Sequence, residues 1–352
     1  MKELNWIKLA SVYAGCFLGA GYVSGQELWQ YFGAFGPWGY VGLAVSMVLI
    51  FLLGLVVLRL SALTGVYDAE QLTVPWRCKP LRLCYSVLEL LMMFAVIAIM
   101  NAGVGALAEQ LFSLPHALIS AAFALLVLAL TLTGLRGIVS VFSLSVPCLV
   151  VSAAALGAAA LIRGGLPSVE VREVNGLLSN WLVSAVNYAS YNFFVTIAII
   201  APFGRYAKKR STVWVGIGSG SLMLLLIAVA VLLSVAGIPG AAEAELPMLF
   251  VASSLHPWAA YGYAVLLFFA MLGTALSCQV SFVGYFTARF PFLKEHRNAL
   301  VPVVGLAAYL AGLLGFGDLI GVLYPVFGYG GAVFILMMVV HYFMARKQKL
   351  LT

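Results

Sequence analysis

Charged residues are scarce in this chain. Only 9% of its 352 residues are Asp, Glu, Lys or Arg, whereas 64% are hydrophobic. Such a composition excludes a soluble globular protein and indicates an integral membrane protein. Polar stretches long enough to form a separate soluble domain are also missing. The net charge of +7 does not indicate nucleic-acid binding, because the basic residues lie near the ends of apolar segments.

Catalytic sequence motifs are absent as well. The chain contains no H-E-x-x-H metal motif, no G-x-S-x-G nucleophile motif and no phosphate-binding loop. We therefore predict that it is not an enzyme and that it carries no organic cofactor. The five cysteines offer no disulfide framework, because three lie inside apolar segments and two lie on the predicted cytoplasmic side.

Ten apolar segments can be drawn, each about as long as a membrane span requires. They cover residues 7–32, 39–63, 83–112, 115–133, 138–162, 178–203, 211–237, 257–288, 299–316 and 319–344. With the amino terminus inside, 17 of the 19 Lys and Arg residues fall on the inner side, and Arg163 and Arg172 fall outside. This pattern predicts a multi-pass protein of the bacterial plasma membrane with both termini in the cytoplasm.

The first segment is interrupted by glycine. Its middle contains Gly15, Gly19, Gly21 and Gly25. Each glycine costs roughly 1 kcal/mol of helix stability relative to alanine, so a break in the helix is expected. Backbone groups freed at mid-membrane must face protein or a water-filled cavity, and such a break can hold a small zwitterion beside a cation. Close helix packing on small residues is the alternative, but the polar residues Ser24, Gln26 and Glu27 favour the break.

The sixth segment has a polar centre. Residues Asn187 to Asn192, NYASYN, place polar side chains on every face of a helical turn, with about ten apolar residues on either side. An interfacial aromatic belt would lie nearer the membrane surface. We therefore expect a second break or a cavity wall here.

The positions of the two unusual segments suggest two repeats. Each is followed by four further segments, and five segments turn the second half upside down relative to the first. We predict an all-α polytopic membrane protein with ten transmembrane helices in a five-plus-five inverted repeat, with helices 1 and 6 broken. The repeats are residues 1–165 and 166–352, and the binding site lies between them at mid-membrane.

Two stretches carry a resemblance to a known family. The run GCFLGAGYVSGQELWQYF and the later YASYN followed by Pro-Phe-Gly resemble the YkvI-like bacterial membrane proteins, relatives of the amino acid-polyamine-organocation superfamily with the leucine-transporter fold. The resemblance implies a solute held between the unwound parts of helices 1 and 6, and a cation site between helices 1 and 8.

The implied cation site uses backbone and hydroxyl oxygens. Its candidates are the carbonyls of Gly15, Leu18 and Ala270, the hydroxyl of Thr274 and, because Gly273 replaces a second hydroxyl, that of Ser277. Some proton-coupled relatives of this fold fill the site with a lysine from the fifth segment, and none is present here. The resemblance therefore places sodium slightly ahead of protons. A proton-coupled version would use Glu89 and Glu27. A pair between Glu89 and Arg82 is an equal alternative for Glu89.

The predicted function is secondary active transport of a small amino-acid-like or amine solute by alternating access. We expect its partners to be this solute and the lipid bilayer. We do not expect it to bind nucleic acid. The alternative is a membrane sensor or accessory subunit that keeps the fold without transporting. The candidate solute-binding residues are Gly19, Gly21, Ser24, Glu27, Tyr188, Ser190, Tyr191 and Asn192. Glu27 would gate or attract the solute.

Overall fold

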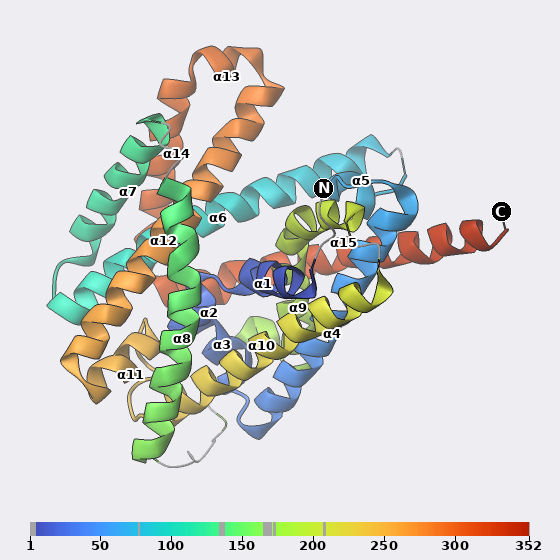
Figure 1. The fold of residues 1–352 in the computed structure, drawn as a ribbon. Helices are drawn as coiled ribbons and strands as arrows, with labels where there is room; N and C mark the ends of the chain where they lie inside the picture. The colour runs from blue at the N-terminus through green and yellow to red at the C-terminus, as the bar shows by residue number, and fades with distance from the viewer. Residues whose placement is uncertain are drawn as a thin grey trace.

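The computed structural model describes residues 5–351, except 77, 134–137, 165–170, 172–173 and 207–208. Within these residues the chain forms helices joined by turns and loops, with one isolated antiparallel bridge between Phe35 and Val171 (Figure 1). The predicted boundary between the two repeats, at residues 165 and 166, lies outside the described residues.

The helices follow the predicted apolar segments. They are α1 (Trp6–Phe17), α2 (Ala20–Ser24), α3 (Gln26–Leu28), the π-helical turn η1 (Trp29–Gly33), α4 (Pro37–Thr64), α5 (Ala69–Thr73), α6 (Lys79–Phe112), α7 (His116–Thr133), α8 (Ile138–Gly164), η2 (Gly176–Leu178), α9 (Trp181–Ile200), η3 (Ala201–Arg205), α10 (Arg210–Gly237), α11 (Pro247–Leu255), α12 (Pro257–Arg289), α13 (Pro291–Glu295), α14 (Arg297–Gly312) and α15 (Phe316–Leu351). Seven helices in the described part of the chain are long and apolar enough to cross a membrane, and two shorter apolar helices accompany them. The chain is therefore a multi-pass membrane protein.

The predicted break in the first segment is confirmed. Helix α1 ends at Phe17, and Gly19 is extended, with φ −84° and ψ 173°. Gly25 then adopts a left-handed conformation, with φ 84°, between α2 and α3. Only glycine adopts this conformation without a steric cost, so Gly25 explains why the helix turns here.

The predicted break in the sixth segment is wrong. Helix α9 is continuous through Asn187 to Asn192. Helix α9 contains no glycine or proline, and two of its polar groups bond to the preceding turn. The Ser190 hydroxyl donates to the Val186 carbonyl at 2.7 Å, and the Asn192 amide donates to the Tyr188 carbonyl at 3.2 Å. Neighbouring helices satisfy other polar groups, so the backbone remains helical.

Helix α9 is buried among several partners. It packs against α4, α15 and the pieces of the first segment, whereas α1 packs mainly against α10. Figure 1 shows α7, α12, α13 and α14 gathered on one side of the molecule and α4, α9 and α15 on the other, and α6 contacts both groups. The polar centre of α9 therefore faces protein rather than lipid.

Buried tyrosines hold the pieces of the first segment in place. Tyr13 in α1 donates to the Ile50 carbonyl of α4 at 2.6 Å. Tyr22 in α2 donates to the Leu224 carbonyl of α10 at 2.6 Å, and Tyr263 in α12 donates to the Val23 carbonyl of α2 at 2.5 Å. The last bond supplies a donor to a carbonyl at the end of a broken helix, as a nonpolar environment requires.

Candidate functional site

A buried carboxylate lies between the first segment and α9. Glu27, in α3, is 5% exposed. Its Oε1 atom accepts hydrogen bonds from the Tyr191 hydroxyl and, at 3.5 Å, from the Asn192 amide. The break in the first segment and the polar face of α9 thus meet at one side chain. A carboxylate with these neighbours can hold a proton or a cationic ligand.

Gly21 makes room for this carboxylate. A Cβ atom at position 21 would lie 2.7 Å from Oε2 of Glu27, which is closer than two such atoms normally approach. The Gly25 turn separates the two residues along the chain and lets Glu27 fold back over α2. Gly19, in contrast, has no atom within 4 Å of the position that its Cβ would take.

Five aromatic rings form a cluster next to the carboxylate. Tyr191 stacks on Tyr324 with ring centroids 4.7 Å apart, and Tyr188 lies 5.6 Å from Tyr191. Tyr31 lies 5.2 Å from Tyr188, and Phe32 lies 4.8 Å from it. The Tyr188 hydroxyl is buried near Glu27 without a hydrogen bond of good geometry, so it remains available to a ligand.

Tyr31 and Tyr324 were not among the predicted site residues. Tyr31 directly follows the glycine-rich run and lies in the π-helical turn. Its position next to that run could have identified it as a site residue from the sequence. Tyr324 precedes Pro325 within α15. Its ring reaches Tyr191 because α15 packs along α9, which no local pattern indicates.

A hydrogen-bonded bridge joins the first segment, α9 and α15. The Tyr31 hydroxyl donates to Oδ1 of Asn187 at 3.1 Å, and the Asn187 amide donates to the Pro325 carbonyl at 2.9 Å. Gly328 is necessary for this contact, because a Cβ atom there would collide with the Asn187 amide. Asn187 therefore positions the helices around the site.

The charge of Glu27 has no basic partner. The ion pair between Arg82 and Glu70, with 3.8 Å between Nε and Oε1, does not involve Glu27. The groups that bond to Glu27 are a phenol and an amide, which are neutral. A buried carboxylate surrounded by neutral donors needs a proton or a cation to compensate its charge.

Two of the predicted hydroxyl groups are engaged locally. Ser24 donates to the Gly21 carbonyl at 2.9 Å and accepts from the Gln26 amide at 3.4 Å. Ser190 bonds within its own helix. Gly21, Glu27, Tyr188, Tyr191 and Asn192 thus lie together, while Ser24 and Ser190 shape the backbone beside them.

The residues of the predicted cation site differ in their exposure. Leu18 and Ala270 are buried and Thr274 is half-buried, but Gly15 is exposed. Ser277 is also exposed, and its hydroxyl donates to the Gly273 carbonyl at 2.8 Å. Ser277 is therefore a poor substitute for the missing hydroxyl, and the sodium assignment stays a prediction.

Glu89 lines a separate cavity of about 280 Å³ between α6, α9 and α12. The other lining residues are Met92, Met93, Val96, Phe194, Val195, Ala198, Ile199, Cys278 and Ser281. The alternative pair between Glu89 and Arg82 does not form, since Arg82 contacts Glu70. The cavity lies toward the end of the bundle where α6 begins and α12 ends.

At the opposite end of the bundle, hydrogen bonds link the first segment, α15 and the loops beside a pocket of about 740 Å³. Gln30 donates to the Gly317 carbonyl at 2.9 Å, and the Gly317 amide donates to Glu245 at 2.7 Å. Asn175 donates to the Gly321 carbonyl at 2.6 Å. In a regular helix the backbone N–H of residue 325 would donate to the Gly321 carbonyl. Residue 325 is proline and has no N–H, so the Asn175 side chain donates to this carbonyl instead.

Comparison with known proteins places this geometry in context. The chain is 25% identical over 335 residues to the membrane protein YkvI of Bacillus subtilis, which covers 93% of each chain. It is also 25% identical over 348 residues to YyaD of the same organism, which covers 92% of each chain. Both relatives are uncharacterized. The resemblance found in the sequence is confirmed. No family model matches the chain.

Solved structures share the fold. An inward-facing conformation of Mhp1 aligns with a TM-score of 0.65 at 13% identity, covering 98% of this chain and 79% of Mhp1. A manganese transporter of Eremococcus coleocola, as the H236A mutant, aligns with a TM-score of 0.51 at 16% identity, covering 95% of this chain and 76% of that protein. The chain therefore has the leucine-transporter fold of Mhp1.

Proposed function

We propose that this YkvI-like chain is a secondary transporter that moves a small solute with an amino group by alternating access, with Glu27 as the counterion of that group. The observation that carries the proposal is the buried Glu27, bonded to Tyr191 and Asn192 where the broken first segment meets α9. An ammonium group would compensate a carboxylate that lacks a basic partner. The fold shared with Mhp1 and with a manganese transporter supports transport as the general role.

The neighbouring tyrosines suit such a solute. An ammonium or alkyl-ammonium group is attracted by the faces of aromatic rings as well as by the carboxylate. Tyr188 offers a buried hydroxyl near Glu27 for a further polar group, and the backbone at Gly19 borders open space. We assign the α-carboxylate of an amino-acid-like solute, where present, to this hydroxyl and to backbone amides near Gly19.

Pockets lie toward both ends of the bundle, so they do not distinguish an inward-facing from an outward-facing state. Hydrogen bonds among Gln30, Gly317 and Glu245 link the segments at the end away from Glu89. We propose that this hydrogen-bonded end is extracellular and that both termini are cytoplasmic in the bacterial plasma membrane. We further propose ten spans in a five-plus-five inverted repeat, with only the first span broken.

We propose that the coupling ion is sodium or a proton. Leu18, Ala270 and Thr274 are the candidate sodium ligands, and Glu27 and Glu89 are the candidate proton carriers. The prediction that the chain is not an enzyme agrees with its transporter-like structural neighbours.

Uptake into proteoliposomes tests the function. We expect radiolabelled amines or amino acids to enter vesicles containing the purified protein and to exchange in counterflow. Tyr188→Ala should abolish this flux, because it removes a fully buried ring of the site, whereas Tyr261→Ala should not, because Tyr261 is exposed. Binding of a solute without uptake or counterflow would support the sensor or accessory role instead.

Two matched variants test the cation. If sodium drives uptake, we expect Thr274→Ala to remove the sodium dependence and Ser277→Ala to preserve it, because the Ser277 hydroxyl is directed to its own helix. Solute uptake in sodium-free buffer that responds only to a proton gradient would exclude sodium coupling.

The contact between Gly21 and Glu27 gives a third prediction. Gly21→Ala should displace the carboxylate from Tyr191 and lower solute affinity about tenfold, the effect of one weakened charge-assisted hydrogen bond. Gly19→Ala is the control, since its methyl group would enter open space. The affinity is measured by thermal-shift titration with the solute that the uptake screen identifies. Equal affinities for the two variants would contradict the proposed role of Gly21.

A further inference from the structure

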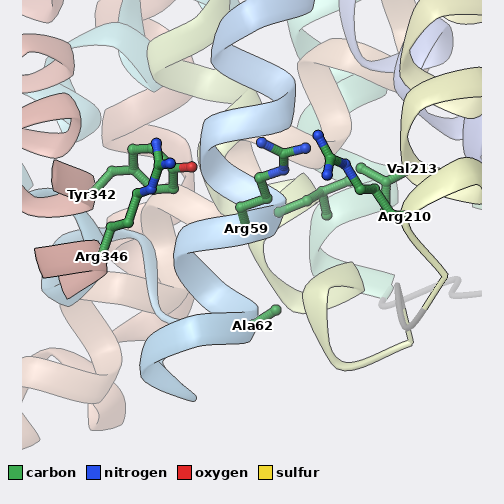
Figure 2. Close-up of a pocket in the computed structure, with 7 residues that line it drawn as sticks. Arg59, Ala62, Arg210, Val213, Tyr342 and Arg346 are labelled. Carbon is green, nitrogen blue, oxygen red and sulfur yellow. The ribbon is translucent and has the colours of Figure 1, made fainter. Parts of the chain in front are cut away.

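A basic pocket lies between α4, α10 and α15, apart from the residues around Glu27 (Figure 2). Its volume is about 480 Å³. The lining residues are Leu58, Arg59, Ala62, Arg210, Val213, Tyr342 and Arg346. Three helices therefore each contribute one arginine, and none of the seven lining residues is acidic.

The three arginines concentrate positive charge. Figure 2 shows Arg59 and Arg210 pointing toward one another from facing helices, with Arg346 beside Tyr342 on the third helix. In the part of the chain that the structure describes, none of these three arginines forms an ion pair with a carboxylate. Like charges that converge on one space without a carboxylate repel one another, and an anion would relieve that repulsion.

The start of α10 adds further positive charge to the pocket. Arg210 is the first residue of this 28-residue helix, and Val213 in its first turn also lines the pocket. The free N–H groups at a helix start carry a partial positive charge and bind anions, above all phosphate. The side chains and the backbone thus favour the same kind of ligand.

The surroundings of the pocket are those of a membrane interface. The Arg59 guanidinium lies over the Trp214 ring, 5.5 Å from its centroid, which fixes the arginine in place. Trp214 is 40% exposed, and Phe343, next to the lining residue Tyr342, is 59% exposed. Exposed aromatic rings beside basic side chains are typical of the level of lipid headgroups.

We propose that this pocket binds a phosphate group, supplied by the headgroup of an anionic phospholipid. Arginine offers paired N–H donors that match two phosphate oxygens at once, and Arg59 and Arg210 present two such groups to one ligand. The acyl chains would then lie along the exposed apolar surface beside Trp214. The site binds lipid independently of the solute and uses none of the residues around Glu27.

Thermal-stability titrations of the purified full-length protein in detergent test the pocket. Short-chain phosphatidylglycerol should raise the melting temperature, and phosphatidylcholine, whose headgroup is neutral overall, should not. Each arginine that approaches an anionic headgroup contributes about fivefold in affinity. The double variant Arg59→Gln/Arg210→Gln should therefore weaken the response to phosphatidylglycerol at least tenfold.

Lys347→Gln is the matched control, because Lys347 is an exposed basic residue next to Arg346 that does not line the pocket. It should leave the titration within twofold of the wild type. If the double variant fails to fold, Arg59→Lys is used instead. Lysine keeps the positive charge but lacks the paired N–H donors of arginine, so this variant should still weaken lipid binding. Inorganic phosphate is titrated in the same way. If it raises the melting temperature as much as the lipid does, and the arginine variants weaken this response equally, the site is confirmed and its ligand is soluble phosphate. An unchanged response of the arginine variants, or an equal response to phosphatidylcholine, would overturn the proposal.

Discussion

Glu27→Gln should lower amine uptake about 100-fold while leaving the protein folded. The glutamine side chain has nearly the same shape, and its amide oxygen can still accept hydrogen bonds from Tyr191 and Asn192. Only the negative charge is lost. Losing the charged partner of a buried ammonium group costs about 3 kcal/mol, which corresponds to roughly two orders of magnitude in affinity.

The initial rate of uptake and the solute affinity measure this effect in proteoliposomes. Glu89→Gln is the matched control, because Glu89 lines a different cavity and is only half-buried. It should keep solute affinity near the wild-type value. Counterflow separates the two roles open to Glu27. Loss of both counterflow and uptake identifies the solute's counterion, whereas counterflow retained without gradient-driven accumulation identifies a proton carrier and contradicts the counterion role.

Gly25→Ala should give a large loss of stability, about 2 kcal/mol in the free energy of unfolding. Part of this loss is conformational, because a left-handed φ costs an alanine about 1 kcal/mol relative to glycine. The rest is steric. The added Cβ would lie 3.1 Å from Cγ of Met248 and 3.3 Å from Cγ1 of Val231, so α11 or α10 must move.

Gly65→Ala is the control for this prediction. Gly65 ends α4 with φ 70°, but no atom lies within 4 Å of its Cβ position, so its substitution carries only the conformational cost. Melting temperatures in the same detergent should therefore fall further for Gly25→Ala than for Gly65→Ala. Equal decreases would show that α2 and α3 are not packed as tightly around this turn as the structure indicates.

The positions of the helices could be predicted from the sequence. Each predicted apolar segment coincides with helical structure, because lipid leaves the backbone few alternatives to internal hydrogen bonding. The break in the first segment was also predictable, since glycine weakens a helix locally whatever surrounds it. Gly25 in particular takes a conformation that other residues avoid.

The second break was predicted wrongly for an instructive reason. The polar residues of α9 indicated that the segment could not face lipid, and this is correct. They did not indicate whether the backbone or the neighbours would satisfy them. The Asn187 amide bonds to α15, and Tyr191 and Asn192 bond to Glu27, so an intact helix suffices.

The sequence by itself determined which segments are helical, where the first one breaks and which residue types could bind a small polar solute. These properties depend on local backbone preferences and on the cost of polar groups in lipid. Only the tertiary structure decided that Glu27 faces Tyr191, that Tyr324 joins the site and that Arg59, Arg210 and Arg346 share a pocket. Those contacts join residues between about 130 and 300 positions apart, and such distant pairings depend on how whole helices pack rather than on any local pattern.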